Sequence, residues 1–247
     1  MGKEIYVSAG SYFPDFSNHF PGNDIFFWYE NEDHCGMRFS ASSPHVDELN
    51  DSQAISARLF SLSLLVNGAL RLERGRCIPY PIEFTGCEGL GYSAFPPFED
   101  YPFTADSRDA PMPDGAADPR QRLSSHLLFL SKKDDSLRGL LFLVGLLSRN
   151  SSLERILSWN TLYRIKDTVS TLCRECGFAL DNYVNTNELE RFTAACNNMS
   201  VMGIFARHGQ TANKPPTRIM TDLDEAEALI VGMASRFIRN YLRVKHA

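Results

Sequence analysis

The sequence predicts an α+β protein in which a small N-terminal antiparallel sheet with a covering helix is followed by a C-terminal helical bundle. Aromatic and alternating apolar segments come first, a proline-rich segment follows, and helical periodicity then continues almost to the last residue. We therefore expect an N-terminal α+β unit over residues 1–93, a proline-rich linker over 94–120 and a helical bundle over 121–247.

Two short segments rich in aromatic and alternating apolar residues predict a β-hairpin. They cover residues 24–30 (DIFFWYE) and 35–41 (CGMRFSA), with a polar tetrad between them. The aromatic run at 26–29 is expected to pack in the core, because the acidic residues around it would repel a phosphate backbone. The alternative is an exposed sheet that stacks nucleic-acid bases. A third strand is expected over residues 81–87.

A long helix is expected to cover the hairpin, from Ser52 to a stop near Gly75. Its apolar residues recur at the spacing of one buried helical face. They are Ile55, Leu59, Leu62, Val66, Ala69 and Leu72.

The second half of the chain predicts helices. Residues 94–120 carry six prolines, which exclude a long helix or a central strand there. Beyond them, four amphipathic helices of similar length predict a bundle. They are expected over residues 123–147, from a Ser151–Glu154 capping box to Gly177, from near Asn187 onward, and from a Thr221 cap to the basic residues at 239–246.

The composition is that of a globular protein with a mildly acidic charge. A formal charge of −5 argues against coating DNA or an anionic membrane by bulk charge. The first residues do not resemble a signal peptide, and no stretch is expected to cross a membrane. We therefore expect a cytoplasmic protein whose six cysteines are free thiols.

Polar residues that could carry chemistry gather between two predicted helices, over residues 197–220. Arg207 and His208 are adjacent there, and an arginine with a histidine can bind phosphate and transfer a proton. That is the minimum for cleaving RNA through its own 2′-hydroxyl, without a metal or cofactor. The alternative is structural, because an Arg-His-Gly sequence at a helix end also caps terminal carbonyls.

Three further residues of this segment are candidates for substrate binding. Asn197 and Asn213 could position a substrate, and Lys214 could contact its charge. With Arg207 and His208 as the catalytic pair, they complete the predicted site.

The helical half resembles a widespread and largely uncharacterised family of bacterial proteins. The similarity is carried by residues 159–169 (WNTLYRIKDTV), 190–198 (ERFTAACNN), 203–209 (GIFARHG) and a last helix that begins TDLDEAEALI, with a helix like LLVNGAL (64–70) in the N-terminal half. This resemblance covers most of the chain outside the linker. It implies a fold and no particular reaction.

A more distant similarity is to HEPN domains, helical bundles common in prokaryotic toxins and antiviral systems, many of them metal-independent ribonucleases. Their signature places an arginine four to six residues before a histidine, ahead of the final helix. Here Arg207 directly precedes His208, and the family's spacing occurs instead at Arg120 and His126. The resemblance therefore implies a HEPN-like fold whose catalysis is lost or arranged differently.

Two functions follow as expectations. The first is a binding or regulatory protein of a bacterial conflict or stress response, such as an anti-phage system, that contacts a protein partner or RNA through the helical half. The second is a metal-independent ribonuclease that uses Arg207 and His208, for which the HEPN resemblance implies a homodimer.

Competing chemistries have weaker support. Zinc could be bound by Cys173, Cys176, Cys196 and His208. The thiols, however, lie on apolar helix faces, which favours their interpretation as core residues. Motifs for nucleotide binding, serine hydrolysis and helical metalloprotease sites are absent. Three single histidines of the N-terminal half are expected to be solvated and are assigned no role: His19, His34 and His45.

Overall fold

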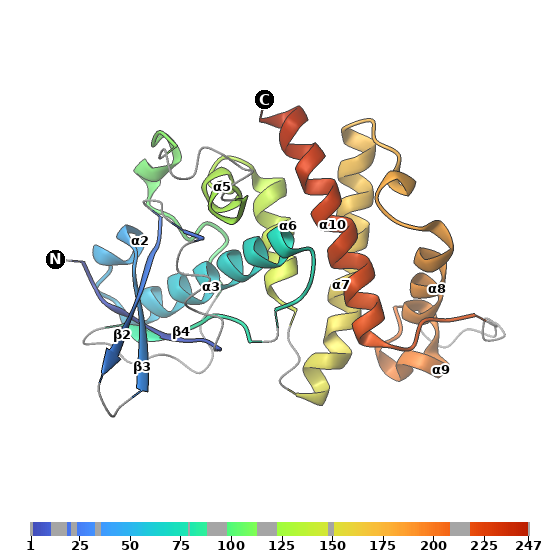
Figure 1. The fold of residues 1–247 in the computed structure, drawn as a ribbon, viewed down its shortest axis with the longest axis horizontal. Helices are drawn as coiled ribbons and strands as arrows, with labels where there is room; N and C mark the ends of the chain where they lie inside the picture. The colour runs from blue at the N-terminus through green and yellow to red at the C-terminus, as the bar shows by residue number, and fades with distance from the viewer. Residues whose placement is uncertain are drawn as a thin grey trace. The chain divides into compact units, whose positions relative to one another are not determined.

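The chain forms two compact units. Unit 1 comprises Met1–Leu70 and Ile78–Gly145, and unit 2 comprises Arg71–Cys77 and Leu146–Ala247. The structure, a computed structural model (Figure 1), describes residues 2–10, 19–20, 24–32, 36–78, 80–87, 98–112, 123–147, 151–207 and 218–246. The predicted α+β class is confirmed, because a small antiparallel sheet precedes a mostly helical C-terminal region.

The sheet of unit 1 has four antiparallel strands in the order β2-β3-β1-β4. The strands are β1 (Ile5–Ser8), β2 (Phe26–Glu32), β3 (Gly36–Ser42) and β4 (Glu83–Cys87). The predicted hairpin is β2 and β3, with Trp28 opposite Ser40. The predicted third strand is β4, but it pairs with β1, a strand of four residues that the sequence analysis missed.

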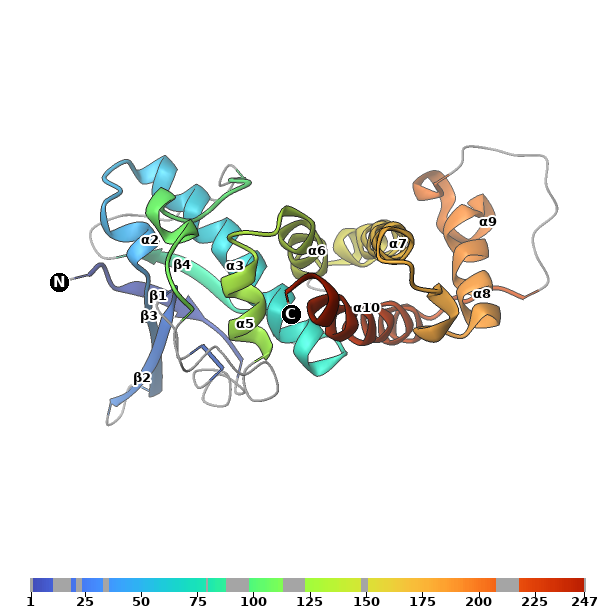
Figure 2. The ribbon, with the colours of Figure 1, turned by 90° about the horizontal axis from the view of Figure 1, so that it is seen from above.

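The two faces of the sheet differ in burial. Helix α3 (Ser52–Arg74) runs beside the sheet (Figure 2). Phe27 and Phe84 are buried on one face, with ring centroids 6.1 Å apart. Phe26 points to the other face, is 56% exposed and stacks on Trp28 at 5.9 Å. The prediction that the aromatic run packs in the core is correct for Phe27 and wrong for Phe26 and Tyr29. Alternation of successive side chains places Phe26 on the opposite face. Tyr29 lies on the same face as Phe27 but is 46% exposed.

Helix α3 (Ser52–Arg74) is the predicted covering helix, and its six periodic apolar residues are all buried. The short helix α2 (Pro44–Asp47) precedes it. Asp51 accepts a hydrogen bond from the Ala54 N–H at 2.7 Å at the start of α3, and Gly75 follows its end with φ of 66°. A glycine adopts this left-handed conformation without the penalty of a Cβ atom.

One helix, α3, is long and apolar enough to cross a membrane, which differs from the expectation that no stretch would be. In the structure, however, 89% of its most apolar window is buried within the protein. That is the environment of a core helix, so the part of the chain that the structure describes is compatible with a soluble protein.

The single helix expected over residues 123–147 is two helices, α5 (Leu123–Leu130) and α6 (Asp135–Gly145). The Asp134 carboxylate interrupts them by accepting a hydrogen bond from the Leu137 N–H at 2.9 Å, at the start of α6. Polar side chains of this kind compete with helix continuation by capping a new first turn.

Both helices belong to unit 1, so the division between units lies at Gly145 and not at the expected position 121. Helix α6 crosses α3 at two glycines, where a Cβ atom at Gly68 would overlap the Leu141 carbonyl and one at Gly145 would overlap that of Leu64. Glycine permits this backbone contact, which holds α6 to unit 1.

The described part of the expected linker, residues 98–112, is attached to unit 1. The Glu99 carboxylate accepts a hydrogen bond from Arg58 Nη2 at 2.6 Å, and Phe103 is 3% exposed. A one-turn helix, η1 (Ala105–Arg108), follows it. This stretch packs as an ordered part of the domain.

Unit 2 is built on three long helices: α7 (Ser152–Glu175), α8 (Thr186–Asn197) and α10 (Leu223–Lys245), with the short elements η2 (Leu180–Asn182), α9 (Met199–Met202) and η3 (Gly203–Phe205). Ser151 caps α7 as predicted, by accepting a hydrogen bond from the Glu154 N–H. The cap of α10 is Asp222, one residue after the predicted Thr221.

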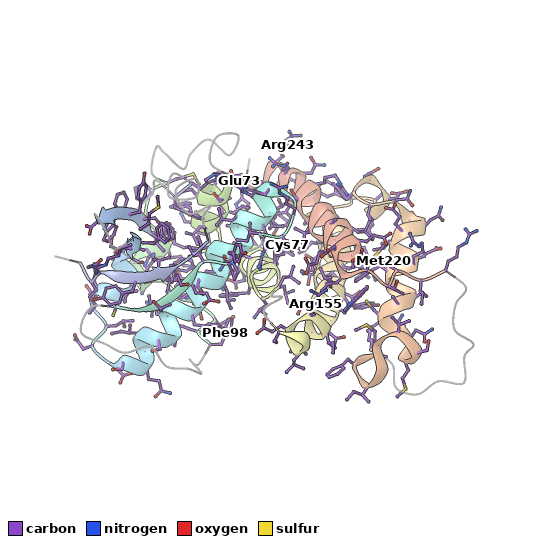
Figure 3. The ribbon with its side chains drawn as sticks, turned by 60° about the horizontal axis from the view of Figure 1, so that its bottom comes forward. Glu73, Cys77, Phe98, Arg155, Met220 and Arg243 are labelled. Atoms are coloured by element: carbon purple, nitrogen blue, oxygen red, sulfur yellow. The ribbon has the colours of Figure 1, made fainter. Side chains whose placement is uncertain are left out.

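Aromatic rings fill the core of unit 2. Trp159 of α7 stacks on Phe192 of α8 at 5.9 Å, and Phe237 of α10 contacts Tyr183 at 5.7 Å. The chain enters α10 through Met220, which is fully buried and whose N–H donates to the Arg191 carbonyl at 3.2 Å (Figure 3). These contacts set α8 beside α7.

Candidate binding site between α7 and α8

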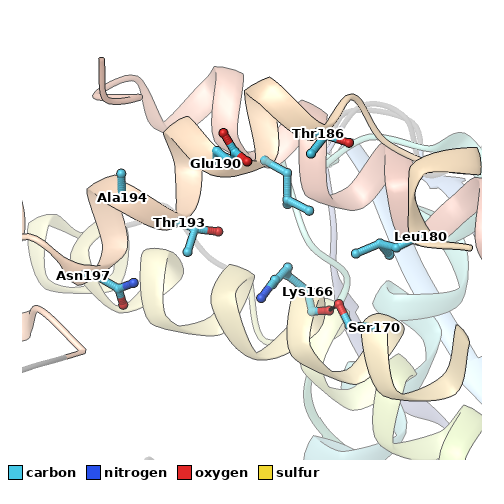
Figure 4. Close-up of a pocket in the computed structure, with 9 residues that line it drawn as sticks. Lys166, Ser170, Leu180, Thr186, Glu190, Thr193, Ala194 and Asn197 are labelled. Carbon is cyan, nitrogen blue, oxygen red and sulfur yellow. Dashed lines mark hydrogen bonds between the residues drawn. The ribbon is translucent and has the colours of Figure 1, made fainter. Parts of the chain in front are cut away.

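A pocket of about 470 Å³ lies between α7 and α8 (Figure 4). This is within the usual range of small-ligand sites. Its lining contains one cation, one carboxylate, three hydroxyl groups, one amide and three apolar side chains: Lys166, Glu190, Ser170, Thr186, Thr193, Asn197, Leu180, Leu189 and Ala194.

Lys166 supplies the positive charge of the pocket. Its side chain is 18% exposed, and its Nζ lies 5.0 Å from the ring centroid of Tyr163, one helical turn earlier on α7. Its one ion-pair partner among the described residues is Asp167 Oδ1, at 3.1 Å. In Figure 4 the ammonium points toward the end of the pocket where Thr193 and Asn197 lie.

Asn197 is the last residue of α8 and lines the same end of the pocket. Its Oδ1 is shielded from solvent and has no hydrogen-bond partner among the described residues. A buried acceptor without a donor costs about 1–3 kcal/mol. Because solvent does not reach this oxygen, an occupant of the pocket does not reach it either in this side-chain conformation.

Of the other lining residues, Ser170 is bonded within its own helix and three are apolar, while Glu190, Thr186 and Thr193 add further polar groups. The Ser170 hydroxyl donates to the Lys166 carbonyl at 2.8 Å, as serines within helices commonly do. Leu180, Leu189 and Ala194 provide an apolar surface. An occupant would thus meet an apolar wall between two polar ends.

Arg207 lies close to this pocket in the structure. Its guanidinium donates to the Tyr163 hydroxyl at 2.6 Å, and its Cζ lies 4.4 Å from the centroid of the same ring. Its backbone N–H donates to the Cys196 carbonyl at 3.0 Å. Cys196 lies in the last turn of α8, so this bond satisfies a carbonyl at a helix end, as the structural alternative expects of this segment, while the exposed arginine side chain contacts Tyr163.

The structure thus brings two of the five predicted site residues near one another. Asn197 lines the pocket, and Arg207 shares the Tyr163 ring with the pocket cation Lys166. The other three, His208, Asn213 and Lys214, lie outside the described residues.

Sequence reasoning missed Tyr163, Lys166 and Glu190. The first two lie three residues apart on α7, which places them on one face of the helix. That spacing is a signal the sequence does contain.

The thiols near the pocket are unreactive. Burial raises the pKa of Cys196 to about 12, although the nearby Lys166 ammonium partly opposes the shift, and burial with the neighbouring Cys176 raises the pKa of Cys173 to about 11. Both are neutral thiols at physiological pH, whereas metal ligation and nucleophilic attack use the thiolate. The fourth ligand of the zinc hypothesis, His208, lies outside the described residues.

A second polar cluster lies inside unit 1, where sequence reasoning expected solvated groups. His45 is 2% exposed, so the expectation that it is solvated is wrong. Its Nε2 lies 3.0 Å from Asp24 Oδ1, and the same carboxylate oxygen accepts a hydrogen bond from Lys132 Nζ at 2.7 Å. Lys132 is also 2% exposed.

This cluster is internally satisfied. The Thr104 N–H donates to His45 Nδ1 at 3.1 Å, so the imidazole carries its proton on Nε2 and donates to Asp24. Lys132 Nζ also lies 4.2 Å from the Phe129 ring centroid. With its charged groups bonded to one another and little exposure, the cluster holds residues 24, 45, 104 and 132 together.

Comparison with known proteins does not add to this description: no family model, no curated protein and no solved structure matches the chain. The functional argument therefore depends on the geometry of the α7–α8 pocket.

Proposed function

We propose that the protein is a binding or regulatory protein that receives a protein partner in the pocket between α7 and α8. The observation that carries this proposal is the composition of the pocket. A cation, a carboxylate and an apolar wall line one cavity of about 470 Å³, and the Lys166 ammonium, which has one ion-pair partner among the described residues, has N–H donors left for an occupant.

The charges of the pocket favour a protein over RNA as the partner. Lys166 and Glu190 carry opposite signs, so the lining has no net charge. Nucleic-acid backbones are held by clusters of lysine and arginine, and a carboxylate beside them is repulsive. A protein segment can pair with both the Lys166 and the Glu190 charge and can pack an apolar side chain against the apolar wall.

The exposed apolar residues that follow α8 support the same proposal. Ile204 is 83% exposed and Met199 is 39% exposed. Methionine and large aliphatic side chains on a surface mark protein contacts when they group together. They lie on α9 and η3, which continue the chain from the Asn197 end of the pocket.

The cellular setting rests on the sequence alone. The resemblance to HEPN domains is the basis for a HEPN-like fold in unit 2 and for a role in bacterial conflict or stress response, and cytoplasmic residence is proposed with them. These remain proposals beside the binding function.

Site-specific crosslinking tests the binding function. A photo-crosslinking amino acid at Thr193, in the pocket, should capture one protein in the host bacterium, and Lys166→Glu should reduce its yield. The matched control is Thr171, exposed on α7 but outside the pocket, which should not capture it. Crosslinks to RNA alone, or equal yields at both positions, would contradict the proposal.

The ribonuclease remains a second candidate because of one observation: Arg207 presents an exposed guanidinium that is held on the Tyr163 ring. Such a group can bind a phosphate. If the candidate is correct, the purified protein cuts RNA in the presence of a chelator, and His208→Ala abolishes cutting without changing the melting temperature. Intact RNA at high protein concentration would eliminate it.

A further inference from the structure

The C-terminal half of α10 carries a row of arginines on one face. Arg236, Arg239 and Arg243 follow one another at intervals of three and four residues, so their side chains leave the helix on the same side. All three are exposed. At a rise of about 1.5 Å per residue, the row is about 10 Å long. No aspartate or glutamate follows Glu227 in the sequence, so the row has no acidic residue on its own segment.

A second segment of unit 2 extends this row. The end of α3 packs against α10, where the Arg239 guanidinium donates to the Glu73 carbonyl at 3.2 Å. A Cβ atom at Gly75 would lie 3.3 Å from Ser235 Oγ of α10, so the chain stays close to the helix there. Arg76 comes next and is also exposed. We call these four side chains the α10 arginine surface: Arg76, Arg236, Arg239 and Arg243.

Main-chain carbonyls, and not carboxylates, position two of these guanidinium groups. Arg236 Nε donates to the Tyr183 carbonyl at 2.8 Å, as Arg239 does to that of Glu73. No ion pair joins the α10 arginine surface to a carboxylate of the described residues, whereas Arg191 on α8 pairs with a glutamate at 3.0 Å. Each guanidinium has five N–H donors, so most of them are available to an anion from outside.

The dipole of α10 accounts for only part of this surface. It places about half a negative charge at the C-terminal end of the helix, which favours cations in the last turn, where Arg243 lies. Arg236 and Arg239 lie before the last turn, and Arg76 lies outside the helix. The remaining positive charge is therefore not explained by the stability of α10.

We infer that the α10 arginine surface binds the phosphodiester backbone of a single-stranded nucleic acid, a function separate from that of the α7–α8 pocket. The planar guanidinium donates two parallel hydrogen bonds to a phosphate, and a backbone presents its phosphates in a row. One strand can follow one helix face. Charges more than about 10 Å apart are largely screened at about 0.1 M salt, so the formal charge of −5 of the whole chain does not cancel this surface.

Other anionic partners fit the α10 arginine surface less well. Protein interfaces draw most of their affinity from aromatic and apolar groups in a desolvated centre, and no large apolar side chain belongs to this surface. A helix that binds an anionic membrane inserts its apolar face into the lipid. The apolar face of α10 is buried in the core of unit 2, as at Phe237 and Ile238. A nucleic-acid backbone requires the charges alone.

The salt dependence of binding tests this inference. Fluorescence anisotropy of a labelled oligouridylate, titrated with the full chain, gives the binding constant at each salt concentration. On logarithmic axes, the binding constant of a single strand falls with salt at a slope of about −0.7 for each phosphate neutralised. Arg76→Gln combined with Arg243→Gln should reduce the steepness of this slope by about 1.4 and weaken binding roughly tenfold or more at about 0.1 M salt. Arg76→Lys combined with Arg243→Lys keeps both charges and should retain the slope.

The matched control removes two exposed charges from α7, by Arg155→Gln combined with Arg164→Gln, and should leave the slope unchanged. Arg155 lies apart from Arg243 (Figure 3). Equal losses in the control would assign the effect to net charge and overturn the inference. No binding by the unmodified chain at low salt would also overturn it. If Arg207→Gln removes binding while the Arg76 and Arg243 pair retains it, the strand lies elsewhere and the inference is wrong. Circular dichroism verifies that the variants fold.

Further probes identify the partner. Oligothymidylate bound as tightly as oligouridylate assigns DNA as well as RNA, and weaker binding assigns RNA; both results support the inference. A glutamate oligomer or vesicles containing phosphatidylserine, bound as tightly as oligouridylate through the same arginines, would make the partner an acidic protein or a membrane. Either result would contradict a surface for nucleic acid.

Discussion

Each unit places a lysine ammonium against an aromatic ring, and the two lysines differ in what else they contact. Lys132 in unit 1 lies 4.2 Å from the Phe129 ring, is almost fully buried and bonds to Asp24. Lys166 in unit 2 lies 5.0 Å from the Tyr163 ring, is 18% exposed and faces a pocket.

The difference in burial distinguishes a lysine that stabilises the fold from a lysine that is available to bind a ligand. A buried charge must be neutralised and hydrogen-bonded within the protein, because its desolvation is otherwise too costly. A partly exposed charge keeps water as its partner until a ligand replaces it. Lys132 is therefore expected to matter for folding and Lys166 for binding.

The largest expected effect comes from removing the carboxylate of the unit 1 cluster. Asp24→Ala leaves the Lys132 ammonium buried without its counter-charge, which should lower the free energy of unfolding by about 4 kcal/mol. Urea denaturation measures it, and the exposed Asp109→Asn is the control. A loss as small as that of the control would show that the cluster is not structural.

Acid should remove the same stabilisation from the unmodified protein. Burial alone would raise the pKa of Asp24, but the hydrogen bond with His45 and the charge and hydrogen bond of Lys132 outweigh it, so the pKa lies below its usual 3.8. The folded state then binds fewer protons than the unfolded state. The stabilisation that Asp24 contributes is therefore complete above the pKa of an unfolded aspartate, about 3.9. It is lost as the pH falls through the lower pKa that Asp24 has in the folded protein.

Unfolding at a series of pH values measures this loss. The gap in stability between the unmodified protein and Asp24→Ala should be constant near neutrality and should narrow below pH 3.8. If this difference in stability increased in acid, folding would raise the pKa of Asp24 instead of lowering it, which would contradict the account.

The packing of the two helix pairs provides the next test. Helices α3 and α6 meet backbone to backbone at Gly68, whereas α7 and α8 leave a pocket. Gly68→Ala should destabilise by about 2–3 kcal/mol, because its methyl group overlaps the Leu141 carbonyl. Gly139→Ala, with nothing within 4 Å of the added Cβ, should instead stabilise by about 0.5–1 kcal/mol. Thermal unfolding of the two variants measures this difference. Equal stabilities would contradict the close contact between Gly68 and the Leu141 carbonyl.

The smallest expected effect concerns the ring shared by Arg207 and Lys166. Tyr163→Phe keeps the aromatic face and removes the hydroxyl that accepts from Arg207, so stability should fall by about 1 kcal/mol or less. Tyr80→Phe, at a tyrosine 61% exposed, is the control and should have no effect. A loss of several kcal/mol would mean that Arg207 is structural.

The fold could be predicted where the pattern is long and periodic. Helices α3, α7 and α10 and the β2–β3 hairpin follow directly from apolar spacing. Strand β1 was missed because its four residues are too short to show alternation. The break between α5 and α6 was missed because its apolar residues keep helical spacing across the turn.

The polar clusters were harder to predict than the fold. Asp24 and Lys132 are 108 positions apart, and the sequence around each residue does not predict that the two are in contact. His45 was expected to be solvated because its sequence context is polar. Of the residues that line the pocket, Asn197 was named from the sequence as a candidate, but Lys166 was not, since a single lysine on an amphipathic helix usually faces solvent.

The unfolding free energies of Lys132→Met and Lys166→Met test the comparison most directly. Both variants replace an ammonium by a methionine side chain of similar length. The account predicts a loss of about 3 kcal/mol or more for Lys132→Met, because Asp24 is left buried without its counter-charge, and a change below about 1 kcal/mol for Lys166→Met. Equal losses in the two variants would contradict it, because Lys166 would then be a structural charge and the pocket would have no cation to offer a ligand.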